Sequence, residues 1–151
     1  MLDRTCRRAA LLAAFALLGC AVDAAPGPVA GYPFAYAMDE CGPADGPAVT
    51  VYLSGHALDT LPPEGGHLAV MLWVGRDETM GRTFRSSDQP LRGTVLECGA
   101  PGACNPLAAW RVTMRSFARD TLDGSVDFQL GTRVVAGSFQ ARWSTKRQLC
   151  G

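Results

Sequence analysis

Apolar and polar residues alternate through the last third of the chain. The apolar positions of three successive segments are Trp110, Val112 and Met114, then Val126, Phe128 and Leu130, then Val135, Gly137, Phe139, Ala141 and Trp143. A period of two is that of a β-strand with one buried face, because successive side chains point to opposite sides. We therefore predict three antiparallel strands, with turns at Asp123-Gly124 and Gly131-Thr132-Arg133. Pairing Met114 with Leu130, and Leu130 with Val135, keeps all apolar side chains on one face.

Earlier parts of the chain also show strand patterns. Residues 48–53 alternate, and residues 67–74 are apolar on both faces, as expected of a central strand. Residues 82–86 and 91–98 flank Ser87-Asp88-Gln89-Pro90, which predicts a hairpin turn between two paired strands. No segment beyond the N-terminal region shows the 3.6-residue period of an amphipathic helix. The pattern predicts an all-β fold, a small antiparallel β-sandwich or open barrel of about seven strands.

The N-terminus has the three parts of an export signal. Arg4, Arg7 and Arg8 precede a mostly apolar stretch of residues 9–22, and small residues follow. That stretch is shorter than the roughly 20 residues that a bilayer-spanning helix requires. A basic start, a short apolar core and a small-residue end are typical of a cleaved secretory signal.

Two cleavage sites are present. Leu17-Leu18-Gly19-Cys20 resembles the lipobox of bacterial lipoproteins. This resemblance, which covers only the signal region, implies that Cys20 is diacylated and becomes the mature N-terminus. Ala21, where inner-membrane lipoproteins typically carry Asp, implies an outer-membrane location facing the periplasm. The alternative is ordinary cleavage after Val22-Asp23-Ala24, which predicts a soluble periplasmic or secreted protein.

The chain then divides into a tether and a folded domain. Residues 21–47 contain five prolines and four glycines with little periodicity, and within them residues 35–40 suggest a short edge strand. We expect a signal peptide at residues 1–19, a lipid-anchored Pro/Gly-rich tether at 20–40 and a β domain at 41–151.

The cysteines of the exported part predict disulfide bonds. Apart from Cys6 and Cys20, four remain, and an even number in an exported domain is typical of disulfides. Cys98 and Cys104 flank a short Gly/Ala/Pro loop, so we expect them to pair with each other. Cys41 then pairs with Cys150. The sequence contains no Cys-x-x-Cys, and neither histidine lies near a cysteine in sequence, so we expect no metal site.

Charge argues against nucleic-acid binding. The whole chain has 14 basic and 14 acidic residues, and the signal segment removes three arginines and one aspartate. The mature chain is thus slightly acidic, with 11 basic and 13 acidic side chains. A domain without a basic excess has no general attraction to nucleic acid.

Arginines form the first candidate surface. Arg111, Arg115 and Arg119 recur at even spacing on the predicted outer face of one strand, with Arg133 and Arg142 on or beside the last strand. Such a row suits a weak anion-binding face toward envelope polymers. It is also what an ordinary solvated strand face carries.

The second candidate is the loop of residues 55–66. Leu58 and Leu61 are apolar residues in a loop, which is a usual place for partner binding, unless they close one end of the fold. Ser54, His56 and Asp59 do not predict a catalytic triad, because neighbours on one loop rarely converge on a substrate. We therefore expect no enzyme and no cofactor.

The function predicted from these features is non-catalytic. We expect an envelope lipoprotein, held to the membrane by its lipid, with a binding, assembly or structural role toward an envelope protein partner. One alternative is an inhibitor or immunity-type protein that presents the 55–66 loop to an enzyme. A second is a small envelope hydrolase.

Overall fold

The computed structural model describes residues 27–146 and Cys150. The predicted signal peptide, the Cys20 lipidation site and the first part of the predicted tether lie outside the described residues. No helix in the described ranges has the length and hydropathy needed to cross a membrane.

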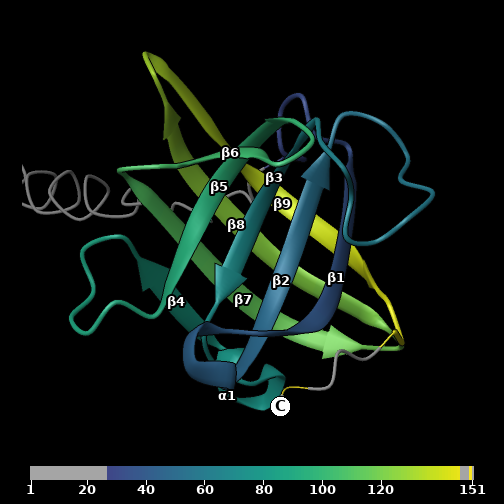
Figure 1. The fold of residues 1–151 in the computed structure, drawn as a ribbon, viewed down its shortest axis with the longest axis vertical. Coiled ribbons are helices and arrows are strands. Elements are labelled where there is room, and N and C mark those ends of the chain that lie inside the picture. Colours follow the sequence, from purple (N-terminus) through teal and green to yellow (C-terminus); the bar gives the residue numbers. More distant parts are fainter. Residues whose placement is uncertain (1–26, 147–149, 151) are drawn as a thin grey trace, which may run out of the picture.

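The described chain forms one mixed β-sheet of nine strands that curls into a half-barrel (Figure 1). The strands are β1 Phe34–Cys41, β2 Pro47–Ser54, β3 His67–Leu72, β4 Arg82–Arg85, β5 Gly93–Ala100, β6 Ala103–Pro106, β7 Trp110–Ala118, β8 Thr121–Leu130 and β9 Arg133–Trp143. Their order across the sheet is β4-β7-β8-β9-β1-β2-β3-β5-β6. A 3-10 turn, Pro43–Asp45, and one short helix, α1 Arg76–Thr79, complete the regular structure.

The prediction of an all-β fold is confirmed, but its details need two corrections. The sheet has nine strands instead of about seven, because β1 and the short β6 also join it. It is also not purely antiparallel, since β1 runs parallel to β9 through the pairs Tyr36–Arg142 and Ala37–Trp143. This single parallel pair connects the two antiparallel halves of the sheet.

The inner face of the curled sheet is a continuous apolar core. Alternate residues of β1, β2, β3 and β5 pack against those of β7, β8 and β9, and the largest fully buried side chain is Phe128. The predicted apolar faces of Trp110, Val112 and Met114, and of Val126 and Phe128, are all buried. Burial of these faces stabilises the fold because it removes apolar surface from water.

The β7–β8–β9 meander is present, but its registers differ from those expected. Trp110 pairs with Phe128, Met114 with Gly124, and Leu130 with Arg133. The first turn lies at Arg119-Asp120, where both residues have positive φ angles of 49° and 59°. Asp123 and Gly124 lie inside β8 instead. Because both shifts are even, the apolar side chains remain on the inner face.

The predicted hairpin of residues 82–98 is wrong. β4 pairs with β7, from Arg82–Met114 to Arg85–Arg111, and β5 pairs with β3 on the other side of the sheet. Phe84 of β4 is buried in the core beside its partner Val112. The apolar face of β4 is thus buried through its pairing with β7. Ser87–Pro90 belongs to the connection that leads from β4 to β5 on the other side of the sheet.

The folded region begins earlier than residue 41, the expected boundary. β1 is an interior strand between β9 and β2, not an edge strand. Upstream of it, Pro28 forms a parallel bridge with Ser138, and Val29 is 3 % exposed. Residues 27–40 therefore belong to the sheet domain, which leaves only residues 20–26 of the expected tether.

Both expected cysteine pairs are present as disulfides. Cys41 at the end of β1 is bonded to Cys150, 109 residues later. Cys98 of β5 is bonded to Cys104 of β6, six residues later, across a two-strand ladder. The first bond ties together the two ends of the described domain, and the second holds the outermost strand.

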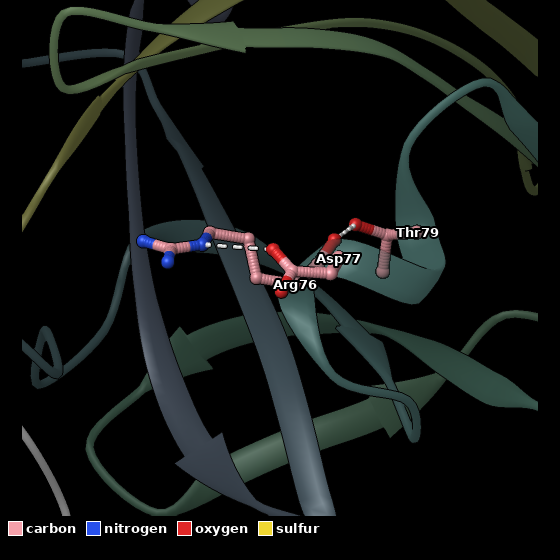
Figure 2. Close-up of polar contacts among 3 residues, drawn as sticks. All are labelled: Arg76, Asp77 and Thr79. Carbon is pink, nitrogen blue, oxygen red and sulfur yellow. Dashed lines mark hydrogen bonds and ion pairs between the residues drawn. The ribbon is translucent and has the colours of Figure 1, made fainter.

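Helix α1 packs against the end of the sheet. Thr79 is fully buried, and its hydroxyl donates to the Arg76 carbonyl at 2.6 Å (Figure 2). The Arg76 guanidinium lies 4.8 Å from the Phe117 ring centre and 5.4 Å from that of Trp143. Its ion pair with Asp77, 3.8 Å across and largely exposed, contributes little. The cation–π contacts fix α1 against β7 and β9.

Candidate functional site

A groove of about 550 Å³ lies on the outer face of the sheet, over the parallel junction of β1 and β9. Tyr36 of β1 and Arg142 of β9, which are paired across this junction, belong to its lining. The loop of residues 55–66 contributes Leu58–Leu61, and the segment after β9 contributes Ser144–Lys146. Asp120, in the turn between β7 and β8, and Trp143 at the end of β9 complete the lining.

The loop side of the groove is anchored by apolar packing. Leu58 and Leu61 are partly buried and pack against a small outer cluster of Met38, Tyr52 and Ala69. The Leu58 amide donates to the Tyr36 hydroxyl at 3.2 Å. The two leucines cover the outer face of the sheet, and the parts of them that stay exposed line the groove.

The opposite side is held by backbone hydrogen bonds. The Trp143 amide donates to the Asp120 carbonyl at 2.8 Å, and the Ser144 amide donates to the Ala37 carbonyl at 2.7 Å. Lys146 then reaches across, and its Nζ donates to the Leu61 carbonyl at 3.3 Å. Both sides of the groove are therefore fixed to the same sheet and to each other.

Charges of both signs line this groove without neutralising one another. Asp59, Asp120, Arg142 and Lys146 are all exposed. Over the described ranges, no hydrogen bond or ion pair engages the Arg142 guanidinium or the two carboxylates. Unpaired charges of opposite sign, beside Tyr36 and the leucines, suit a ligand that carries both a cation and an anion.

A buried polar cluster supports the strands beneath the groove. Thr50 is fully buried and donates to the Glu40 carboxylate at 2.9 Å, and the Tyr52 hydroxyl donates to the other oxygen of Glu40. Burial, together with Glu40, raises the pKa of Tyr52. Tyr52 therefore stays a neutral hydrogen-bond donor, and these contacts link β1 to β2 on the outer face.

His67 lies next to that cluster. The residue is 6 % exposed, and its ring packs edge-on against Tyr52 with centres 5.5 Å apart. Its Nδ1 atom has no hydrogen-bond partner among the described residues. Burial lowers the pKa of His67, and a hydrogen bond to the Gly65 backbone partly opposes this. His67 thus belongs to the packing beneath the end of the 55–66 loop.

The structure does not keep the predicted arginine row together. Arg111 lies on the outer face of β7, opposite Asp127 of β8 in the register of the two strands. Arg115 lies at a β-bulge and donates to the Gly124 carbonyl at 2.7 Å. Arg119 lies beyond the strand, in the turn. The bulge and the turn break the alternation that would have placed the three guanidinium groups in a line.

The residues considered for catalysis are not arranged as a triad. Ser54 is fully buried, so a substrate in solvent does not reach its hydroxyl. The Ser54 hydroxyl is 3.5 Å from His56 Nδ1, and it also accepts a hydrogen bond from the His56 amide at 3.2 Å. These contacts shape the start of the loop. In the described part of the chain, no three His, Cys, Asp or Glu side chains form a group that could hold a metal ion.

Sequence reasoning singled out Leu58 and Leu61 but missed three other residues of the groove, Tyr36, Asp120 and Lys146. Tyr36 lies in the segment that the sequence predicts to be a tether, residues 20–40. The only signal for Tyr36 in the sequence is its place in the predicted short edge strand at residues 35–40. No protein-family model, curated protein or solved structure matches this chain.

Proposed function

We propose that this chain is an exported, non-catalytic lipoprotein, anchored in the outer membrane through acylated Cys20 and facing the periplasm. The lipobox-like signal supports the anchor, and two disulfides are compatible with an oxidising compartment. We further propose that the domain binds an envelope protein through the groove between the 55–66 loop and the C-terminal end of β9.

The observation that carries the binding role is the set of uncompensated charges in this groove. The carboxylates of Asp59 and Asp120 form no ion pair with a described residue, and neither does the guanidinium of Arg142. A segment of polypeptide with a basic and an acidic side chain supplies both partners. The leucines and Tyr36 add apolar contact, and the fixed sides reduce the entropy lost on binding.

Cys20→Ser is expected to move most of the protein from the membrane fraction to the soluble periplasmic fraction, because the serine side chain cannot carry the thioether-linked diacylglycerol. Cys6→Ser, inside the signal segment, is the matched control and should leave the protein in the membrane fraction. Fractionation and N-terminal mass determination test this. A wild-type protein that is already soluble and begins at Ala25 contradicts the anchor.

Arg142→Glu is expected to lower the yield of a specific partner adduct by about tenfold, since it places a like charge where the partner's carboxylate binds. The measurement is photo-cross-linking in native membranes from a reactive residue placed at the exposed position Thr60. Arg92→Glu reverses the charge of an exposed arginine outside the groove and should leave the adduct yield unchanged. An adduct that Arg142→Glu leaves unchanged would exclude the groove as the binding site.

A further inference from the structure

The turn between β8 and β9 extends beyond the rest of the sheet (Figure 1). Pairing with β7 ends at Trp110–Phe128, whereas β8 and β9 continue to pair as far as Leu130–Arg133. Residues 131–134 are exposed, and Val134, at 66 % exposure, is the most exposed of the large apolar residues described. This projecting end, residues 130–134, is called the hairpin tip below.

The chain enters the domain from the side of the hairpin tip. Gly27 and Val29 flank Ser138: the Ser138 amide donates to the Gly27 carbonyl at 2.7 Å, and the Val29 amide donates to the Ser138 carbonyl at 3.2 Å. The bridge between Pro28 and Ser138 is parallel, so the chain arrives along the direction of β9. Because β9 begins at Arg133, the described stretch that starts at Gly27 has its N-terminal end directed toward the hairpin tip.

Chain length then limits the distance between the anchor and the hairpin tip. Gly27 lies beside Gly137, and four residues of β9 separate Gly137 from Arg133, so the tip lies about 14 Å beyond Gly27. Cys20 precedes Gly27 by seven residues, which reach at most about 25 Å when fully extended. A fully stretched, straight tether would thus leave a gap of only about 11 Å between tip and anchor.

The chemistry of the hairpin tip fits a bilayer surface. Val134 offers apolar contact, and Arg133 offers a cation for anionic head groups. Tyr32 lies close to the Arg133 guanidinium, and tyrosine is favoured at membrane–water interfaces. The Glu97 carboxylate raises the pKa of the same tyrosine, and Asp127 lies further along β8. Because these acidic groups lie near Arg133, the attraction of the tip to anionic head groups is local and moderate.

We propose that the hairpin tip rests on the bilayer that holds Cys20, with Val134 and Arg133 in contact with lipid head groups. This inference rests on the proposed lipid anchor. It deepens that proposal by giving the domain one orientation: the tip faces the membrane, and the end that carries α1 faces away.

The test attaches the chain to lipid without relying on acylation in the cell. The mature chain, residues 20–151, is coupled through the Cys20 thiol to a maleimide phospholipid in vesicles of phosphatidylethanolamine and phosphatidylglycerol. Amide hydrogen exchange is compared with that of the uncoupled chain. Exchange at residues 130–134 should slow by about fivefold, the factor that one arginine near an anionic surface provides. Exchange at α1, Arg76–Thr79, should not change.

Arg133→Glu combined with Val134→Asp should abolish the slowing without affecting folding, because both side chains are exposed. Leu91→Asp combined with Arg92→Glu makes matching changes at two exposed residues just before β5. This control variant should preserve the slowing of exchange at the tip. Unchanged exchange at the tip, or slowing at α1 instead, would overturn the orientation. Neither result would bear on acylation, which the Cys20→Ser fractionation tests separately.

Discussion

Replacing Cys41 and Cys150 together by serine is expected to lower the free energy of unfolding by about 5 kcal/mol, whereas replacing Cys98 and Cys104 should cost about 2 kcal/mol. A disulfide removes conformations from the unfolded chain, and this effect grows with the length of the closed loop. The first bond closes a separation of 109 residues and the second a separation of six. Urea unfolding of the oxidised variants measures both losses.

The two double variants control for each other, because each removes two cysteines and one bond. Equal losses would contradict the loop-length argument and would point to effects in the folded state. The Cys41–Cys150 bond also ties the chain to β1 at a point four residues after Lys146, and Ser144–Lys146 form one side of the groove. Its removal should therefore weaken cross-linking from position 60 as well, whereas removal of the Cys98–Cys104 bond should not.

The sequence was sufficient to predict the parts of the fold that depend on one buried face. In β7, Trp110, Val112 and Met114 alternate with exposed or half-exposed residues, and the structure buries all three. Such a pattern arises from the geometry of a single strand, so no knowledge of its neighbours is needed. The two disulfides were predictable for a similar reason, since loop length and position left one natural pairing.

Turns were less predictable, because a glycine can either form a turn or allow close packing inside a strand. The sequence pattern predicts a turn at Gly124, yet this residue lies in β8, where an added Cβ would overlap the ring of Phe139. The turn is formed instead by Arg119 and Asp120, which adopt positive φ without glycine. The glycine was needed for close packing, and only the neighbouring strand reveals that need.

The groove could be predicted only in part. Leu58 and Leu61 were recognisable as apolar residues in a loop, but whether they face a partner or the sheet depends on Met38 and Tyr52 beneath them. The floor depends on the pairing of Tyr36 with Arg142, from opposite ends of the chain. A parallel pair between distant segments has no local signature, and so the site appears only when the sheet is assembled.

Gly137→Ala is expected to lower the free energy of unfolding by about 2–3 kcal/mol, because it forces extra volume into a close backbone contact. A Cβ at this position would lie 2.6 Å from the Cα atom of Val29 and 2.8 Å from the Gly27 carbonyl oxygen. These are backbone atoms, so no side chain can rotate away to relieve the overlap. Urea unfolding measures the loss. Gly99→Ala is the control, with no atom within 4 Å and an expected change below about 0.5 kcal/mol.

The cause of that loss can be separated from a general loosening of the core. If the added methyl group displaces residues 27–29, the Val29 amide loses its bond to Ser138 and its hydrogen exchange accelerates more than that of the β2 amides. Uniform acceleration across β2 and Val29 would contradict this local cause. Because the displaced residues would lengthen the proposed tether at its folded end, the same variant, coupled through Cys20 to vesicles, should also lose the protection of the hairpin tip. The close packing of Gly137 against Val29 would then determine how near to the membrane the domain is held.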